Sequence, residues 1–292
     1  MDWLAHQGRL LLCAVQFLTR IPTPALRRFE TDWITRATCY FPLVGQAVGA
    51  ISAGVFLLGF QVWGSGVAAV LAISAGLLVT GAFHEDGLAD TADGLGGGQT
   101  APRRLEIMKD SRIGTYGVCA LVVALGLKIG VLATLSAQTG ALALLAAHGA
   151  GRAAAVVVMR ATSYASAGEA GKWKPTPMGV RTCEVMVALV IAAWPLALLS
   201  TPSVAAGLVL GGVAAAILTR TAVRLIGGHT GDVLGAVEQV FEVGFLLGLG
   251  WSDLMSIGRI PPPSGNDRLS RLGGGGAARL DARGPRPDPG LA

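Results

Sequence analysis

Charged residues are scarce in this chain of 292 residues. Asp, Glu, Lys and Arg make up only 14% of it, whereas soluble globular domains carry about 25%. From Ala37 to His84 there is no Asp, Glu, Lys or Arg at all. Hydrophobic residues account for 52% and the mean hydropathy is +0.58. This balance excludes an ordinary soluble domain and predicts an all-α, polytopic membrane protein, because a lipid-exposed backbone must satisfy its own hydrogen bonds.

Cysteines and aromatic residues are also few. The four cysteines, Cys13, Cys39, Cys119 and Cys183, have neither CxxC nor metal-ligand spacing, so the sequence predicts neither a disulfide framework nor a zinc site. Aromatic residues make up 6%, and no aromatic-interleaved basic stripe accompanies the net charge of +5. Nucleic-acid binding is therefore not implied.

About six or seven transmembrane helices are expected, since a span needs about 20 mostly apolar residues. One candidate, 185–200, is short and contains Trp194–Pro195. The amphipathic stretch 3–18 bears Arg9 and is expected to be interfacial or re-entrant. The candidate spans are 41–62, 66–84, 117–137, 141–161, 185–200, 203–224 and 233–251.

The chain divides into two parts by composition. Residues 1–255 are predicted to form a membrane-embedded catalytic domain. Residues 256–292 are rich in Gly, Pro and Arg and contain few apolar side chains. Such a segment cannot bury enough surface to offset the entropy of ordering, so we expect a disordered basic tail. No small-residue cleavage site marks a signal peptide.

Loop charges predict the orientation of the bundle. The turns near 63–65, 138–140 and 201–202 carry no charge. Because Lys and Arg are enriched in cytoplasmic loops, the alternate connections should face the cytoplasm. A crossing by 233–251 would place the arginines of the tail outside, so whether that segment spans stays open. The basic residues of the alternate connections are Arg103, Arg104, Lys109, Arg112, Lys172, Lys174, Arg181, Arg220 and Arg224.

An acidic cluster, HEDGLADTADG (84–94), follows the uncharged stretch. If the apolar helix continues through it, Asp86, Asp90 and Asp93 fall within about 60° of one helix face. Carboxylates one turn apart can share a hard cation, so this face predicts a Mg²⁺ site. Glu85 lies about 100° around the helix from Asp86 and is a weaker ligand candidate. The alternative is a solvated acidic helix end.

Cationic and hydroxyl groups follow in IMKDSRIGTYG (107–117). Carboxylates that hold Mg²⁺ beside cations that hold phosphate are what phosphoryl transfer requires. A diphosphate substrate would suit this loop, and Asp110 is a candidate base or further metal ligand. The candidate substrate-binding residues here are Arg103, Lys109, Arg112 and Tyr116.

The long motif HEDGLADTADGLGGG, followed by RRLEIMKDSRIGTYG, resembles the signature of the cobalamin synthase family, the adenosylcobinamide-GDP ribazoletransferases. The resemblance extends over about residues 10–250. It implies a polytopic inner-membrane enzyme that joins adenosylcobinamide-GDP to α-ribazole or its 5′-phosphate, releases GMP and needs Mg²⁺. The Ala-Ser-Ala after Tyr164 and His229 depart from the family pattern. Its weaker later pieces are AHGAGR (147–152), SYASAGEAGKWKP (163–175) and GGHTGDVLGA (227–236).

Three further ionic positions have two interpretations each. Arg152 lies one turn after His148 within a predicted span, and contacts either substrate phosphate or a buried partner. Asp232 either caps the following helix or, as the resemblance implies, serves catalysis at the metal or the entering hydroxyl. Lys172 is a substrate-binding candidate next to Trp173, which is either an interfacial anchor or a stacking surface for a base.

Two other function classes remain open from the residues alone. An intramembrane prenyltransferase would also hold Mg²⁺ and diphosphate, but the second Asp-rich motif that such enzymes carry is missing. A divalent-cation or metabolite transporter would use the acids as a permeation site, but no second copy of the cluster indicates repeated halves. The expected partners are the two small substrates and the lipid bilayer, and a homo-oligomer is left open.

Overall fold

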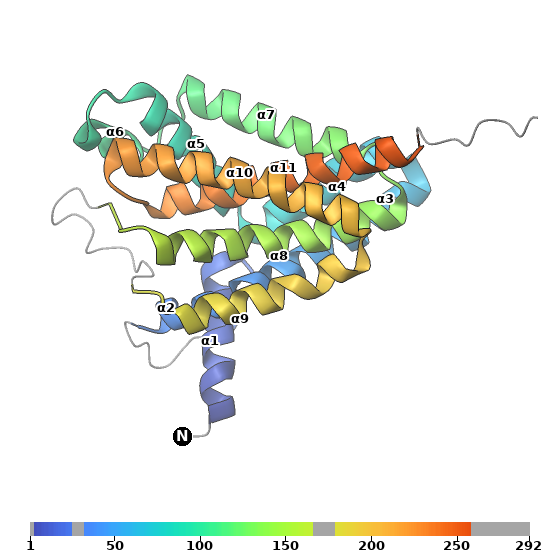
Figure 1. Cartoon of the computed structure of the whole chain (residues 1–292), viewed down its shortest axis with the longest axis horizontal. Helices are drawn as coiled ribbons and strands as arrows, with labels where there is room; N and C mark the ends of the chain where they lie inside the picture. Colours follow the sequence, from blue (N-terminus) through green and yellow to red (C-terminus); the bar gives the residue numbers. More distant parts are fainter. Residues whose placement is uncertain (1–2, 25–31, 166–178, 258–292) are drawn as a thin grey trace, which may run out of the picture. The chain divides into compact units, whose positions relative to one another are not determined.

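The computed structural model describes residues 3–24, 32–165 and 179–257, and Met1–Met255 form one compact unit. The described residues are helical and contain no β-strand, which confirms the all-α fold (Figure 1). Most of the predicted tail lies outside these residues. The main helices are α1 (Trp3–Leu18), α2 (Trp33–Ala37), α3 (Phe41–Trp63), α4 (Ser65–Thr80), α5 (Phe83–Gly97), α6 (Ala101–Ile107), α7 (Thr115–Leu132), α8 (Ala137–Ala161), α9 (Thr182–Ala193), α10 (Thr201–Ile226) and α11 (Gly231–Ile257), with 3₁₀ turns η1 (Thr38–Tyr40) and η3 (Trp194–Leu198).

Five of the described helical segments are long and apolar enough to cross a membrane, and α4 with α5 could make a sixth. The segment Thr182–Leu198 is apolar but too short to cross the membrane. The structure therefore does not support the seventh transmembrane helix that the sequence allowed. Residues 231–251 do qualify as a span. The five segments are Trp33–Trp63, Thr115–Leu132, Ala137–Ala161, Thr201–Ile226 and Gly231–Trp251.

The helix interfaces depend on small residues. At the crossing of α10 and α11, a Cβ placed on Gly248 would lie 2.4 Å from the backbone nitrogen of Gly207. Lipid tails are as apolar as leucine side chains, so membrane helices associate through close packing rather than through hydrophobic burial. Glycine at this crossing lets the two backbones meet.

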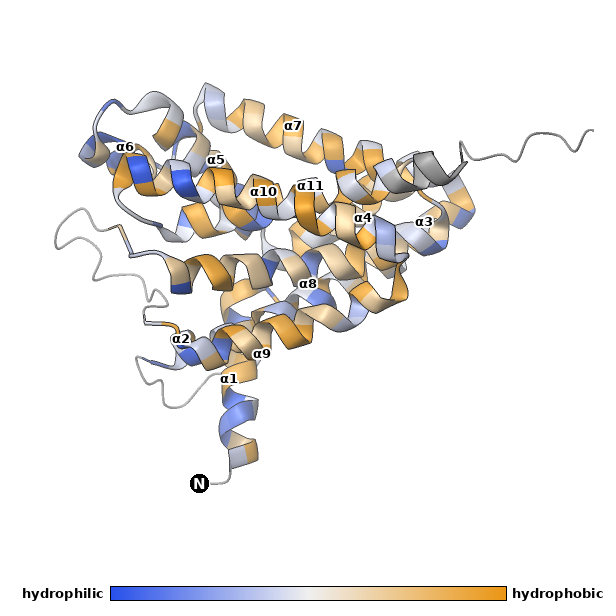
Figure 2. Cartoon of the chain, viewed as in Figure 1, coloured by the Kyte–Doolittle hydropathy of each residue, from blue (hydrophilic) through white to orange (hydrophobic). Residues whose placement is uncertain are grey.

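The charged connections gather at one end of the bundle. Figure 1 shows α6, the neighbouring part of α5 and the α10–α11 turn at that end, with the α3–α4 turn at the opposite end. Figure 2 shows hydrophilic residues on α6 and the adjacent end of α10, whereas α7 and α9 are mostly hydrophobic. The alternation of charged and uncharged connections expected from the sequence therefore corresponds to two ends of one bundle.

A sharp break separates α4 from the acidic helix. The two helices meet at 90°. Both residues between them are left-handed, Gly81 with φ 68° and Ala82 with φ 57°. The expectation that the apolar helix continues through the acids is therefore wrong. The acids lie on a separate helix, α5, whose own 3.6-residue periodicity keeps their face.

Helix α1 projects from the bundle with its N-terminus outermost (Figure 1). Its C-terminal half packs into the core through Leu10, Ala14 and Leu18. Trp3 and Leu4, at its free end, are 70% and 75% exposed. This helix is not among the candidate spans, which fits an amphipathic helix in the membrane interface.

Candidate active site

The aspartates of α5 differ in their surroundings. Asp86 is exposed, Asp90 is half-buried and Asp93 is buried. The carboxylate of Asp93 accepts hydrogen bonds from the backbone N–H groups of Gly114 (2.7 Å) and Gly117 (2.9 Å) at the start of α7. Asp93 thus supplies a helix cap from another element, and its carboxylate is partly used by the protein itself.

A fourth aspartate lies at the same place. A Cβ added to Gly87 of α5 would lie 2.7 Å from the carbonyl oxygen of Asp232 and 3.1 Å from its Cα. Gly87 is flanked on α5 by Asp86 and, one turn later, by Asp90. The start of α11 is therefore packed directly against the acidic helix. The structure packs the backbone of the predicted catalytic Asp232 against the helix that carries the predicted metal ligands, but among the described residues these aspartates do not bring three ligand atoms within 4.8 Å of one another.

Glu85 is oriented differently from its neighbour Asp86. Its Oε1 accepts a hydrogen bond of 2.9 Å from the side-chain amide of Gln239 on α11. Its Oε2 is buried and has no hydrogen-bond partner. This agrees with the 100° between consecutive helical residues. The hydrogen bond to Gln239 directs the side chain of Glu85 into the bundle, away from the exposed carboxylate of Asp86.

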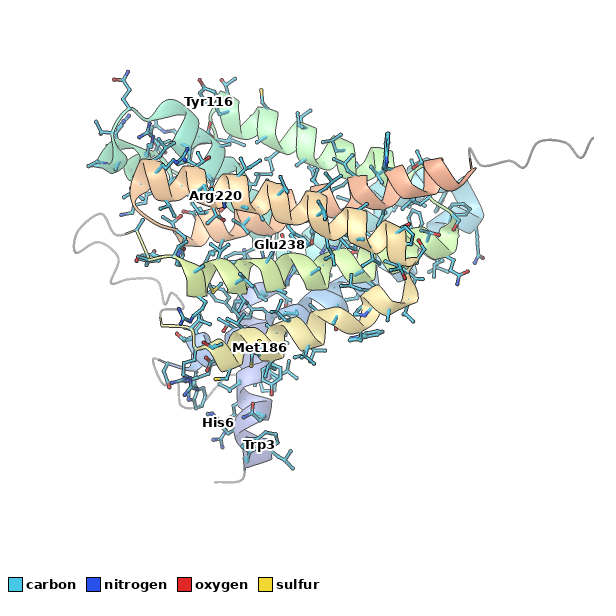
Figure 3. All side chains as sticks on the ribbon, in the orientation of Figure 1. Trp3, His6, Tyr116, Met186, Arg220 and Glu238 are labelled. Atoms are coloured by element: carbon cyan, nitrogen blue, oxygen red, sulfur yellow. The ribbon has the colours of Figure 1, made fainter. Side chains whose placement is uncertain are left out.

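A buried ionic network fills the centre of the bundle. Lys128 on α7 donates to Gln239 (2.7 Å) and to Glu242 (2.5 Å). Arg152 on α8 donates to Glu238 (2.6 Å), which Figure 3 labels in the middle of the bundle. All five residues are at most 2% exposed. Such groups are tolerated in a membrane because they are paired.

This network also contains the one metal-like cluster among the described residues. Ligand atoms of His148, Glu238 and Glu242 lie within 4.8 Å of one another. Lys128 and Arg152 already supply two positive charges to these carboxylates, which is the role that a metal ion would have. For Arg152 this geometry favours the buried ion pair over the substrate contact.

The basic residues lie in and around the loop between α6 and α7. Asp110 and Arg112 form an exposed ion pair of 2.6 Å, and Arg103 pairs with Glu106 at 2.8 Å. The hydrogen bonds from Arg112 lower the pKa of Asp110 to about 2. A carboxylate of this pKa is a poor proton acceptor near neutral pH.

Three more predicted substrate contacts remain, of which two lie near this loop and one lies outside the described residues. The exposed ring of Tyr116 lies over Gly96 of α5, where a Cβ would be 2.9 Å from Cγ of the ring. Lys109 is exposed. Figure 3 places Tyr116 at the end of the bundle where α5 and α6 lie. Lys172 lies outside the described residues.

Comparison with known proteins identifies the family of the chain. A family model described as cobalamin-5-phosphate synthase matches residues 10–250. The chain belongs to this family. Its curated relatives are named adenosylcobinamide-GDP ribazoletransferase, an enzyme. The chain is therefore an enzyme. The matched range 10–250 includes the acidic helix, the basic loop and the buried network.

Three relatives resemble the chain over most of both sequences. The protein of Leptothrix cholodnii is 42% identical over 258 residues, covering 85% of this chain and 97% of its own length. That of Ralstonia pickettii is 45% identical over 253 residues (85% and 98%), and that of Vibrio cholerae 40% over 241 residues (82% and 92%). No solved structure matches this chain.

In this member of the cobalamin-5-phosphate synthase family, the contribution of α11 is larger than the sequence indicated. Glu238 and Glu242 are one turn apart in an apolar helix, a spacing that signals one shared buried face. Their pairing with Arg152 and Lys128 had no local signal, because the partners are on other helices. Gln239 was missed entirely, since a lone glutamine in a helix is unremarkable by composition.

His229 is held by hydrogen bonds from both its side chain and its backbone. Its Nδ1 lies 2.8 Å from the hydroxyl of Thr162, and its backbone pairs with Ser163 and Ala165. Burial lowers the pKa of His229, so the ring is neutral near pH 7. His229 joins the loop after α8 to the loop before α11 and so positions the start of the helix that carries Asp232.

Proposed function

We propose that the chain is an adenosylcobinamide-GDP ribazoletransferase. It joins adenosylcobinamide-GDP to α-ribazole, or to its 5′-phosphate, and releases GMP in the late nucleotide-loop assembly step of cobalamin biosynthesis. The observation that carries the proposal is the packing of Gly87 against Asp232. It brings the start of α11, with Asp232, against the acidic helix, and Asp93 of that helix contacts the start of α7, next to the loop that bears the basic residues. Phosphoryl transfer needs both kinds of group.

The donor set fits Mg²⁺. Asp86 and Asp90 offer carboxylates on one face of α5, and the candidate base Asp232 is at the start of the helix that packs against α5. Hard cations prefer such oxygen ligands, whereas no soft ligand shares this face. Bound here, Mg²⁺ would neutralise charge on the diphosphate. Asp93 is a further candidate ligand on α5, and both of its oxygens accept backbone hydrogen bonds from the start of α7, so it also positions the basic loop.

The remaining residues bind and orient the substrates. Arg103, Lys109 and Arg112 are exposed cations that hold the phosphate oxygens. Asp110 holds the guanidinium of Arg112 through two carboxylate oxygens, at 3.0 Å from Nε to Oδ1 and 2.6 Å from Nη2 to Oδ2. It therefore orients that cation. Tyr116 lines the same end with its hydroxyl and ring.

The transfer is a single displacement at phosphorus. A ribose hydroxyl of α-ribazole attacks the phosphorus that is bonded to the aminopropanol linker of the corrinoid. The bond from this phosphorus to the bridging oxygen breaks, and GMP leaves with that oxygen. The hydroxyl proton passes to a carboxylate, for which Asp232 is the candidate base. The product is a phosphodiester.

The active-site end faces the cytoplasm of the bacterial inner membrane in this proposal. The connections at that end are basic and those at the other end are uncharged, and basic loops are retained on the cytoplasmic side. A nucleotide-activated substrate made inside the cell would reach the site from there.

The test uses the purified full chain in detergent micelles or liposomes. Incubation with Mg²⁺, adenosylcobinamide-GDP and α-ribazole should release GMP and form a corrinoid product, both quantified by chromatography. Asp90→Asn keeps the side-chain size and removes one charge, so release should fall by about 10²-fold or more. Asp32→Asn is the matched control, because Asp32 is an exposed aspartate paired with Arg36. No GMP from well-folded wild-type protein would reject the proposed function.

A further inference from the structure

Both polar atoms of the Gln239 side chain are hydrogen-bonded inside the bundle. Its amide nitrogen donates to Glu85 (2.9 Å) and to Glu238 (2.9 Å). Its amide oxygen accepts from the ammonium of Lys128 (2.7 Å). The side chain is 2% exposed. Only a group with two N–H donors and an acceptor can join two carboxylates and an ammonium in this way.

The contact with Glu85 is adjacent to the proposed metal ligands. Glu85 immediately precedes Asp86 on α5, and Gln239 lies seven residues after Asp232 on α11. Seven residues are about two helical turns, so Gln239 and Asp232 share a face of α11. Along this face α5 crosses closely, since a Cβ on Gly235 would lie 3.2 Å from the backbone of His84. The hydrogen bond and the glycine crossing together fix how α5 sits on α11.

At this end α5 is held by the Phe17–Phe83 ring contact and by its glycine crossings with α11, and Glu85 adds a side-chain hydrogen bond to α11. Helix α5 begins after the break at Gly81 and Ala82, so the direction of α4 does not set it. Its N-cap, Ala82, makes no side-chain capping bond. A rotation of α5 would move Asp86 and Asp90 together relative to Asp232. The Glu85–Gln239 bond opposes that rotation from the buried side of the helix.

We propose that Glu85 and Gln239 are positioning residues that set Asp86 and Asp90 against Asp232 and thereby tune the divalent-cation site. This inference rests on the proposed function. In this role Glu85 supports the metal ligands and does not bind the metal itself. The role also explains why the amide of Gln239 lies between the carboxylates of Glu85 and Glu238. Outer-shell partners of metal ligands commonly change metal affinity by 10- to 100-fold when they are replaced.

The key variant is Gln239→Glu, which keeps the shape and places a carboxylate opposite Glu85 and Glu238. Mn²⁺ binding to the full chain, without substrates, is followed by electron paramagnetic resonance of the free ion. We expect the Mn²⁺ dissociation constant to rise about tenfold or more. The Mg²⁺ concentration for half-maximal GMP release should rise in parallel, while the KM for adenosylcobinamide-GDP at saturating Mg²⁺ stays unchanged.

The matched control is Gln46→Glu. Gln46 is also a buried glutamine, 3% exposed, that donates to the carbonyl of Ile191 and accepts from Trp194. The same substitution there should lower thermal stability without moving Mn²⁺ affinity. The double variant Glu85→Gln with Gln239→Glu reverses the donor and acceptor at unchanged net charge, and should return Mn²⁺ affinity toward the wild-type value.

Several outcomes overturn the inference. These are unchanged Mn²⁺ affinity in folded Gln239→Glu, an equal shift in Gln46→Glu, no recovery in the double variant, or wild-type protein that binds no Mn²⁺. If Gln239→Glu does not fold, Gln239→Asn provides the same measurement, because it shortens the amide by one methylene without adding charge. The readout needs no turnover, so wild-type protein that binds Mn²⁺ but releases no GMP would reject only the proposed function.

Discussion

The carboxylate of Asp93 accepts a hydrogen bond of 2.7 Å from the backbone N–H of Gly114. Gly114 is the N-cap of α7 and makes no side-chain capping bond of its own. An aspartate from another helix therefore satisfies one of the N–H groups that begin α7, and its negative charge lies at the positive end of the helix dipole. Through this contact, α5 determines where the loop before α7 and its basic residues are placed.

Gly117→Ala should destabilise the protein. A Cβ at this position would lie 2.4 Å from Oδ2 of Asp93 and 3.0 Å from the carbonyl oxygen of Ala89, so the cap must move. Loss of the charged hydrogen bond should cost about 1.5–3 kcal/mol, measured by thermal unfolding in detergent. Gly130→Ala on the same helix is the control, because nothing lies within 4 Å of its Cβ. Equal melting temperatures for the two variants would contradict the capping role.

Ala82→Gly should maintain or raise stability, and Ala82→Val should lower it. Ala82 has φ 57°, which costs an L-residue about 1–2 kcal/mol. Glycine removes the Cβ that causes this cost, whereas a β-branched residue is strongly disfavoured there. The melting temperature of the glycine variant should therefore equal or exceed that of the wild type, and that of the valine variant should be several degrees lower. A more stable valine variant would show that the break at Ala82 is absent in the membrane.

Lys128→Met should lower the free energy of unfolding by about 3–5 kcal/mol, the usual cost of removing one partner of a buried ion pair. Glu242 would be left buried, with Lys128 gone from its 2.5 Å contact. Adding Glu242→Gln removes the negative charge that Lys128 had paired with, and should recover part of the loss. Unfolding curves of the single and double variants test this. An additive further loss in the double variant would contradict the pairing.

Asp110→Asn should leave the pH profile of GMP release unchanged in shape from about pH 6 to pH 9. Arg112 lowers the pKa of Asp110 to about 2. The folded pKa of Asp110 is below its ordinary value of 3.8. The Asp110–Arg112 pair therefore stabilises the loop above about pH 4, and this stabilisation is lost as the pH falls toward 2. A weaker hold on Arg112 should raise the KM for adenosylcobinamide-GDP. Disappearance of the acidic limb would instead identify Asp110 as the base.

Single cysteines at Thr100 and Ser136 should label from opposite sides of the membrane. Both positions are exposed, so burial does not limit their reaction. The native Cys119 and Cys183 are exposed as well and must be replaced. A membrane-impermeant thiol reagent added to intact cells should label position 136 and not position 100. The reverse pattern would place the proposed active-site end outside the cytoplasm.

The sequence by itself determined the features that depend on local periodicity and composition. The low charge content predicted a helical membrane protein, and the spacing of Asp86, Asp90 and Asp93 predicted their common face. It also separated Glu85 from that face, because consecutive helical residues are about 100° apart. The distribution of loop charges predicted which connections share an end of the bundle. Each of these follows from residues that are neighbours in the chain.

Only the tertiary structure decided which groups from different helices meet. The left-handed conformation of Ala82 could not be read from an alanine, so the 90° break before α5 was missed. The packing of Gly87 against Asp232 and the bond from Gln239 to Glu85 join residues more than a hundred positions apart in the chain. The side chain of Asp93 was equally suited by its chemistry to a metal ion or to a helix cap. Its position beside the start of α7 gave it two backbone N–H donors, because burial of those groups requires a partner.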